Sequence, residues 1–575
     1  MREMELYRLW SDRELEDKDL SEELKRISGN TEQINDRFYK ELEFGTGGLR
    51  GVIGAGTNRM NIYTVRKATQ GFVNYLKIKE KSPSMAISFD SRIKSDLFAK
   101  EAAKVCAANG VKAYLYRELA PTPVLSFTVR SFQCSGGIMV TASHNPSKYN
   151  GYKAYGPDGC QMNLEDSEAV IGHINKLDIF KDVRTMDFDR AMGSGLIEYV
   201  PDSVKDAFDE AVKKQQLHAG VCKGSGMKVV YTPLNGTGNR YVRRVLQEIG
   251  VEDVAVVPEQ ENPDGNFTTC PYPNPEFKEA LQLGLALAKQ QQADLLLATD
   301  PDCDRVGVAV PYAGEYQLIT GNEMGCLLLN YVASARIAEG TMPKKPVAVK
   351  TIVTSELTQR IADGYGIELR NVLTGFKFIG EQIGLLEKKG ELDRYVFGFE
   401  ESYGYLAGTH ARDKDAVVAS MLICEMTAYY KKQGKPLYGV LQGLYDQYGY
   451  YLHKQGNFTC EGEKGMQEML SIMDGLRKNR PTSFAGLSVV RFADYGVSEE
   501  IDFRRNPPVK KAITLPKSNV LCFYLENDAS VMIRPSGTEP KMKAYYTGVG
   551  RSREHAEGIC AKLAGDTAEK LGFAK

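Results

Sequence analysis

Three aspartates, Asp300, Asp302 and Asp304, alternate along the segment DPDCDR, directly after the apolar run LLLAT. Carboxylates held this close repel one another unless a cation lies among them. An all-oxygen set without His or Cys favours Mg²⁺ over Zn²⁺. An EF-hand would need Gly at the sixth position and Glu at the twelfth, where this chain has Arg305 and Tyr312. The segment therefore predicts a Mg²⁺ site with an anion near Arg305, and a solvated acidic turn is the alternative.

Ser143 stands in the segment TASHNPS, in a turn that Asn145 and Pro146 close. No Gly-x-Ser-x-Gly elbow surrounds this serine, so an α/β-hydrolase nucleophile is not indicated. A phosphoserine carries nearly two negative charges and would suit the metal of the aspartate cluster. Ser143 is therefore a candidate phosphate carrier, and an ordinary Ser/Asn turn is the alternative.

Four further segments carry groups that suit a sugar phosphate. Arg534 adjoins two hydroxyls and a Gly turn, a plausible phosphate cradle without the spacing of a Walker loop. Arg50 follows a Gly-rich turn, while Thr374 and Lys377 share another segment. Two glutamates and a serine could hold adjacent sugar hydroxyls. Each signal is weak alone, because such turns are commonly structural. The segments are RPSGTEPK (534–541), FGTGGLRG (44–51), TGFKFIG (374–380) and EES (400–402).

The elements that must position these groups recur three times along the chain. Each copy reads as an apolar strand, a polar turn, an amphipathic helix, a Gly stop and another strand, which is a βαβ crossover of a parallel sheet. The copies start with MAISFDSRIKS (85–95), MKVVYTPLNGTG (227–238) and PVAVKTIVTS (346–355). Their first helices are expected to end near Ala107, Glu248 and Ala362.

Each copy is followed by a further strand that runs into one of the chemistry-bearing loops, at 136–153, 293–308 and 394–406. Parallel sheets place ligands at the carboxyl ends of their strands, so the loops can converge on one cleft. The helix 413–433 is expected to close the third unit, with a linker near 445–451. Strands at 520–527, 530–536 and 541–549 and a final helix then form a smaller α+β domain.

Composition limits the class of protein. The chain has 575 residues, enough for about four domains of roughly 150 residues. Its net charge of −1 argues against a general nucleic-acid binder. Eleven cysteines without a CxxC pair fit a reducing compartment. Neither a secretory signal nor a long apolar run is found, which predicts a cytoplasmic protein without membrane contact. Of the histidines, His144 and His410 adjoin the loops, and no chemical role is expected for His173, His218, His453 or His555.

Taken together, the segments resemble the α-D-phosphohexomutase superfamily, and most closely its long bacterial α-phosphoglucomutases. The resemblance covers nearly the whole chain, in family order from Phe44 to Lys541. The matching stretches are FGTGGLRGVIGAGTNRMN, TASHNPSKYNGYKAYGPDGCQ, DPDCDRVGV, TGFKFIGEQ, FGFEESYGYLAGTHARDKDA and RPSGTEPK. The sugar loop departs from some relatives, which have His soon after the Glu-x-Ser, where Tyr403, Gly404 and Tyr405 stand here. His410 could substitute for that histidine.

The resemblance implies three related α/β domains with mixed, largely parallel sheets and a smaller C-terminal α+β domain, all around a central cleft. The expected segments are 1–204 with the phosphoserine loop, 205–316 with the metal loop, 317–448 with the sugar-binding loop and 449–575 with the phosphate-binding loop.

The resemblance also implies the roles of single residues. Ser143 would carry phosphate in the resting enzyme, and Mg²⁺ would bridge it to Asp300, Asp302 and Asp304. Lys153 or His144 could assist proton transfer. The resemblance also places Arg50 near the reacting group. The expected substrate contacts are Arg305, Thr374, Lys377, Glu400, Ser402, Arg534, Ser536, Gly537 and Thr538.

The implied activity is a phosphoglucomutase, an isomerase that exchanges glucose 1-phosphate and glucose 6-phosphate. The phosphoserine would give its phosphate to the sugar, and a bisphosphate would turn around in the cleft and return the other one. Glucose 1,6-bisphosphate would then be intermediate and activator. A phosphomannomutase, a phosphopentomutase and a non-catalytic sugar-phosphate sensor are the alternatives. The expected partners are small sugar phosphates, and the chain could be a monomer or a dimer.

Overall fold

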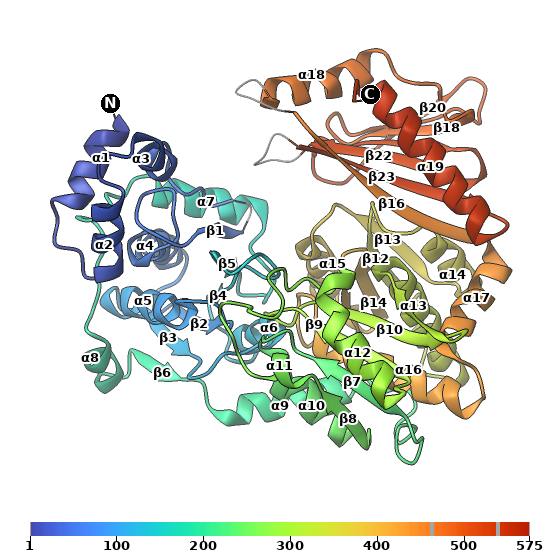
Figure 1. Cartoon of the computed structure of the whole chain (residues 1–575), viewed down its shortest axis with the longest axis horizontal. Helices are drawn as coiled ribbons and strands as arrows, with labels where there is room; N and C mark the ends of the chain where they lie inside the picture. Colours follow the sequence, from blue (N-terminus) through green and yellow to red (C-terminus); the bar gives the residue numbers. More distant parts are fainter. Residues whose placement is uncertain (1, 46, 461–464, 536–540, 574–575) are drawn as a thin grey trace.

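The computed structural model describes residues 2–45, 47–460, 465–535 and 541–573. Its strands form four successive sheets, three of them in α/β units and the last in a β-rich C-terminal unit (Figure 1). This arrangement confirms the predicted fold class. The boundaries of the four predicted segments stay a prediction. The first, third and fourth sheets each fall inside one of those segments, whereas β11 (Glu315–Ile319) of the second sheet crosses the predicted boundary at 316.

The first sheet has the strand order β1-β5-β4-β2-β3-β6. Strands β4, β2, β3 and β6 are parallel, whereas β5 runs antiparallel to both of its neighbours. Helices α1 to α3 precede the sheet, and Trp10 of α1 is fully buried. The elements are α1 (Arg2–Ser11), α2 (Lys18–Arg26), α3 (Thr31–Phe38), β1 (Gly48–Val52), α4 (Ile62–Lys79), β2 (Ser84–Phe89), α5 (Ser95–Ala108), β3 (Lys112–Leu115), α6 (Thr122–Ser131), β4 (Gly136–Val140), β5 (Tyr149–Tyr155), α7 (Leu164–Ile174), α8 (Phe188–Gly193) and β6 (Ile197–Tyr199).

The second sheet has the order β11-β10-β9-β7-β8, with β9, β7 and β8 parallel and β10 and β11 added antiparallel. Every residue of β9, the LLLAT strand, is buried. Its apolar run thus reads as a strand covered on both faces. The elements are α9 (Asp202–Lys213), β7 (Lys228–Thr232), α10 (Gly238–Glu248), β8 (Asp253–Val256), α11 (Pro258–Glu261), α12 (Gln282–Gln291), β9 (Leu295–Thr299), β10 (Val306–Tyr312) and β11 (Glu315–Ile319).

The third sheet has the order β13-β12-β14-β15, and only β15 runs antiparallel. Helix α14 ends at Tyr365 and not near Ala362, because Gly366, with φ of 66°, is the residue that stops it. The elements are α13 (Gly321–Ala338), β12 (Val347–Thr351), α14 (Leu357–Tyr365), β13 (Glu368–Val372), α15 (Phe376–Lys388), β14 (Tyr395–Glu400), β15 (Gly404–Leu406), α16 (Ala416–Lys432) and α17 (Leu437–Tyr448).

The C-terminal sheet has the order β16-β23-β22-β21-β18-β19-β20, with β17 paired to β18, and these pairs are all antiparallel. The predicted linker at 445–451 is wrong, because α17 continues to Tyr448 and β16 starts at Tyr450. The elements are β16 (Tyr450–Thr459), α18 (Gly465–Lys478), β17 (Ser483–Phe484), β18 (Leu487–Asp494), β19 (Glu499–Asp502), β20 (Val509–Ala512), β21 (Leu521–Leu525), β22 (Ser530–Pro535), β23 (Lys541–Gly550) and α19 (Arg553–Lys570).

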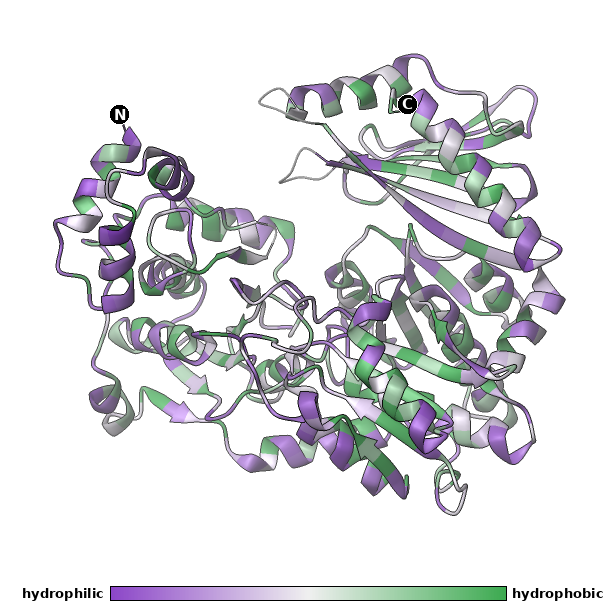
Figure 2. Cartoon of the chain, in the orientation of Figure 1, coloured by the Kyte–Doolittle hydropathy of each residue, from purple (hydrophilic) through white to green (hydrophobic). Residues whose placement is uncertain are grey.

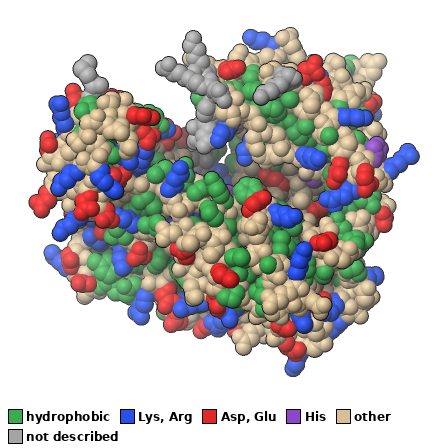
Figure 3. All heavy atoms as spheres, viewed as in Figure 1, with side chains coloured by type: hydrophobic (Ala, Val, Ile, Leu, Met, Phe, Trp, Pro, Cys, Tyr) green, Lys and Arg blue, Asp and Glu red, His purple; other side chains and the backbone are tan. Residues whose placement is uncertain are grey.

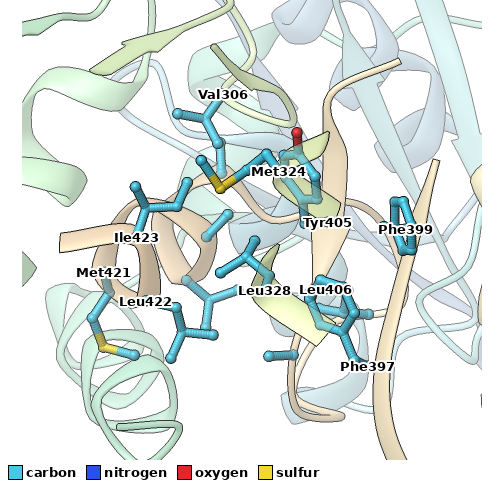
Figure 4. Packing of buried hydrophobic residues seen from close by; sticks show 14 of the residues in the cluster. Val306, Met324, Leu328, Phe397, Phe399, Tyr405, Leu406, Met421, Leu422 and Ile423 are labelled. Carbon is cyan, nitrogen blue, oxygen red and sulfur yellow. The ribbon is translucent and has the colours of Figure 1, made fainter. Parts of the chain in front are cut away.

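The largest apolar core joins the second and third units. Helix α16 is buried along Ala416–Ala428, as expected for a helix that is apolar on all sides. Ile423 of this helix lies near Val306 and Met324 (Figure 4). Figure 2 shows hydrophobic residues along the inner strands and hydrophilic ones on the outer helices. Within the described residues, no helix combines the length and apolar character that crossing a membrane would take.

Candidate functional site

The predicted loops converge on one cleft of about 1010 Å³, which all four units line. Figure 3 shows a hollow between the N-terminal and C-terminal parts of the molecule. Asp300 and Asp302 are fully buried and do not line the cleft. The predicted residues that line it are Arg50, Ser143, His144, Lys153, Asp304, Arg305, Thr374, Lys377, Glu400, Ser402 and Arg534. Ser536, Gly537 and Thr538 lie outside the described residues.

Ser143 is held in an uncommon backbone conformation just beyond β4. Its φ of 51° is left-handed, and its amide donates to Thr141 Oγ1 at 2.8 Å. Behind the loop lies Arg92, which is 3% exposed. Its guanidinium donates to four carbonyl oxygens of the loop, those of Ser143, Asn145, Pro146 and Tyr149. Arg92 therefore fixes the backbone that carries the serine hydroxyl.

Arg92 is in turn held by a buried carboxylate and by the second unit. Its Nε lies 3.2 Å from Asp90 Oδ2, and both side chains are fully buried. Asp90 also accepts from Thr141 Oγ1 at 2.6 Å and from Ser95 Oγ at 2.8 Å. The ring of Phe267, from the second unit, lies 4.9 Å from the guanidinium. The serine loop thus rests on contacts from two units.

The hydroxyl of Ser143 contacts the loop that carries the aspartate cluster. Its Oγ donates to Asp300 Oδ2 at 2.9 Å and lies 3.1 Å from His144 Nδ1. Burial, with Arg305 and Arg50 nearby, holds the pKa of His144 well below its usual value. The imidazole of His144 is therefore neutral near pH 7. Asp300 lies 157 residues from Ser143 in the sequence, yet its carboxylate contacts the serine hydroxyl.

The three aspartates offer oxygens that all lie within 4.8 Å of one another. Burial and the neighbouring carboxylates raise the pKa of Asp300 well above its usual value. Burial also opposes ionisation of Asp304, but Lys153, Lys414 and Arg305 outweigh it and keep its pKa low. Among the described residues, the buried Oδ1 atoms of Asp302 and Asp304 find no hydrogen-bond donor. Such an orphaned oxygen set fits a hard divalent cation.

Two lysines compensate the charge of this cluster. Lys153 Nζ lies 2.6 Å from Asp302 and 3.1 Å from Asp304, and Lys414 Nζ lies 3.2 Å from Asp304. Asp413 accepts from Lys414 at 2.9 Å. Sequence reasoning missed Lys414, although it stands in the quoted stretch THARDKD, because a lone lysine is usually solvated. His410 of that stretch does not line the cleft, and its Nε2 lies 2.8 Å from Asp415.

The loop predicted to bind sugar hydroxyls begins at Glu400, the last residue of β14. Glu400 Oε1 accepts from the Gly375 amide at 2.8 Å, and burial raises the pKa of Glu400 to about 7. The next residue, Glu401, is hydrogen-bonded to Thr351 at 3.0 Å. Arg305 Nη1 lies 2.5 Å from Glu276, a second cleft residue that sequence reasoning missed. Glu400 of the third unit and Arg305 of the second unit thus both line the cleft.

Basic and polar side chains from the third and fourth units also line the cleft. Burial lowers the pKa of Lys377 to about 8. Arg534 donates from Nε to the Tyr545 hydroxyl at 3.3 Å. His453, for which the sequence indicated no role, also lines the cleft. These side chains suit an anionic group such as a second phosphate.

Known proteins resemble this chain over most of its length. Residues 41–179, 206–314 and 320–448 match alpha/beta/alpha domains I, II and III of the phosphoglucomutase/phosphomannomutase family. The chain is 37% identical over 533 residues to the Phosphoglucomutase of Staphylococcus haemolyticus, covering 92% of this chain and 94% of that protein. The Phosphoglucomutase of Staphylococcus epidermidis is 35% identical over 534 residues, covering 93% and 95%.

Solved structures share the fold at lower identity. The phosphoglucomutase parafusin from Paramecium, in an open form, has a TM-score of 0.70 at 16% identity and covers 93% of this chain and 95% of that chain. A phosphoglucomutase/phosphomannomutase family protein from Burkholderia thailandensis has a TM-score of 0.67 at 19% identity and covers 92% and 98%.

Proposed function

The chain belongs to the phosphoglucomutase/phosphomannomutase family and is an isomerase of the phosphoglucomutase kind, and we propose that it interconverts α-D-glucose 1-phosphate and D-glucose 6-phosphate. The observation that carries this proposal is the contact of Ser143 Oγ with Asp300 at 2.9 Å, inside a cleft of about 1010 Å³. A serine at a buried acidic cluster, faced by cationic side chains, suits a phosphate carrier.

In the proposed first step, the P–O bond of phosphorylated Ser143 breaks and a sugar hydroxyl takes the phosphoryl group. The sugar hydroxyl loses its proton, and Ser143 Oγ regains one. His144 Nδ1, at 3.1 Å, is placed to exchange a proton with that oxygen, and Lys153 is the alternative. The product is glucose 1,6-bisphosphate, which turns around and returns its other phosphate to Ser143.

Cationic side chains stabilise the transferred group in this scheme. Arg305 is held by Glu276 at the reacting end, and Arg50 is open to the cleft. Asp300, Asp302 and Asp304 would hold Mg²⁺, whose chemistry is to neutralise charge on the phosphoryl oxygens. Enclosure of the site limits hydrolysis by water.

The non-reacting end of the substrate would lie between the third and fourth units. Glu400 and Ser402 would bind sugar hydroxyls, and Thr374 and Lys377 flank the same position. Arg534, together with Ser536, Gly537 and Thr538, would bind the second phosphate. We further propose a cytoplasmic location, which suits eleven free, buried cysteines.

The test is an exchange assay with Mg²⁺ and added glucose 1,6-bisphosphate. Ser143→Ala is expected to abolish exchange, and Ser82→Ala, at an exposed serine, serves as its matched control. Intact mass should show one phosphate on the wild type that Ser143→Ala lacks. Full exchange by Ser143→Ala would refute the carrier role.

Substrate choice is tested by comparing kcat/KM for glucose, mannose, ribose and deoxyribose 1-phosphates, because specificity is a ratio of these values. Glucose 1-phosphate is expected to give the highest value. A higher value for another sugar would replace glucose in the proposal. Binding without turnover of any of them would favour a sensor.

A further inference from the structure

A second cavity of about 450 Å³ lies between the first and second units, and none of its lining residues lines the catalytic cleft. In the first unit, the cavity is lined by the end of β2, by helix α5 and by the segment after β3. From the second unit, the start of α10 contributes. Its lining includes Arg117, Tyr199, Thr237, Arg240 and Tyr241.

The start of α10 gives this cavity a positive end. The helix has eleven residues and begins at Gly238, and its N-cap residue Thr237 makes no side-chain capping bond. Helix N-termini carry partial positive charge and free amides. The hydroxyls of Thr237 and Tyr241 are buried and, among the described residues, have no hydrogen-bond partner. Buried hydroxyls without partners cost free energy, so a ligand that supplies acceptors would be favoured.

Charged side chains at the cavity add to this preference. Arg117 lies over the ring of Tyr199, 4.7 Å from its centroid. Asp202 is near enough to interact with it electrostatically, but no carboxylate among the described residues forms a salt bridge with Arg117. The two acidic side chains are already paired, since Glu118 bonds Arg240 and Asp96 lies 4.0 Å from Lys100. The free positive potential therefore comes from Arg117 and the start of α10.

The rest of the cavity is bounded by flat or apolar side chains. Phe89, Leu115, Tyr116, Leu119 and Tyr199 all line it. Its volume falls within the usual range for small-molecule sites, of about 300–1,000 Å³. A bare phosphate would fill only a small part of this space, so the fitting ligand also carries a flat body.

We propose that this cavity binds a small phosphorylated metabolite with an aromatic body, the chemistry of a nucleoside monophosphate, and that binding regulates the catalytic cleft. The phosphate lies at the start of α10 beside Arg117, and the aromatic body lies among Tyr116, Tyr199 and Leu119. The binding site is independent of the proposed mutase activity, whereas its regulatory effect rests on it.

Coupling to the cleft follows from the contacts behind the metal loop. The Thr237 amide donates to the Pro301 carbonyl at 2.9 Å. From the first unit, Thr122 bonds Asp302 twice at 2.9 Å, through its amide to the carbonyl and through its hydroxyl to Oδ2. A ligand that bridges the two units next to these contacts would restrain the position of the aspartate cluster relative to Ser143.

The test is calorimetric titration of the full chain with AMP and UMP, with adenosine and inorganic phosphate as separate probes. Saturable binding of a nucleoside monophosphate is expected, with at least tenfold weaker binding of either part. Saturating glucose 6-phosphate is expected to leave nucleotide binding unchanged, because glucose 6-phosphate binds in the cleft and not in this cavity. No saturable binding of AMP or UMP, or full competition by glucose 6-phosphate, would overturn the site.

Arg117→Gln is expected to weaken nucleotide binding at least tenfold, and Arg505→Gln, at an exposed arginine of the fourth unit, is its control. Arg240→Gln, at a mostly exposed side chain, provides a second variant whose folding is not at risk, with a smaller loss expected. Unchanged binding in Arg117→Gln would refute the assigned position.

Regulation is tested separately by the apparent Mg²⁺ affinity and kcat of exchange with and without saturating AMP. A change of at least twofold that disappears in Arg117→Gln supports coupling. AMP binding without a change in Mg²⁺ affinity or kcat would support the binding site and reject its regulatory role. Binding to a chain that proves to lack mutase activity would reject the proposed function and not the site.

Discussion

Replacing Arg92 with Leu is expected to remove most catalysis without touching any residue that contacts the substrate. The guanidinium holds four carbonyl oxygens of the Ser143 loop and lies 3.2 Å from the buried Asp90. Losing one partner of a buried ion pair costs about 3–5 kcal/mol. The loop also loses the donors that hold Ser143 at its left-handed φ of 51°. A displacement of about 1 Å at the nucleophile can lower the rate about 10²-fold.

The double variant Asp90→Asn with Arg92→Leu separates these two effects. It removes the unpaired buried charge, so the urea midpoint is expected to recover in part. The exchange rate is expected to stay about 10²-fold low, since the loop carbonyls still lack their donors. Arg66→Leu is the matched control, because Arg66 is also buried and pairs with Glu101 and Glu16, away from the loop.

The assays are kcat at saturating glucose 1-phosphate, Mg²⁺ and bisphosphate, together with urea unfolding of each variant. Arg66→Leu should lose stability with kcat within about twofold of the wild type. Wild-type kcat in folded Arg92→Leu would show that Arg92 does not position the Ser143 loop. Recovery of kcat in the double variant to the same extent as the urea midpoint would also contradict this role, because Arg92 would then act only by neutralising the buried charge of Asp90.

Three further predictions concern the cleft. Glu276→Gln should raise KM for glucose 1-phosphate about tenfold, because Arg305 loses a charged partner at 2.5 Å; steady-state kinetics with unchanged KM would contradict this. Asp304→Asn should weaken Mg²⁺ binding at least tenfold in calorimetric titration, and unchanged affinity would exclude Asp304 as a ligand. Glu400 has a folded pKa of about 7, above its unfolded value of 4.5, so its contribution to stability is present below pH 4.5 and is lost as pH rises through 7. Glu400→Gln should therefore raise the urea midpoint more at pH 8 than at pH 4.5, and an equal change at both would disprove the shift.

Local patterns in the sequence predicted much of the fold. The LLLAT run became the buried strand β9, with the aspartates in the turn after it. The repeat of strand, helix and Gly stop gave three sheets with parallel cores. The predicted linker at 445–451 was wrong. Residues 445–451 have the Gly- and Tyr-rich composition of a loop, but Gly449, with φ of 97°, joins α17 directly to β16.

The sequence alone indicated the groups that are proposed to carry the chemistry, since residue type and close spacing define a carboxylate cluster or a Gly-rich turn. Only the tertiary structure decided which distant groups meet them. Lys153 lies 149 residues before Asp302, and Lys414 reaches Asp304 from the third unit. Arg92 acts on backbone carbonyls, which every residue has, so its partners leave no pattern in the sequence. Residues that are close along the chain can be identified from the sequence, whereas contacts between units depend on how the sheets pack.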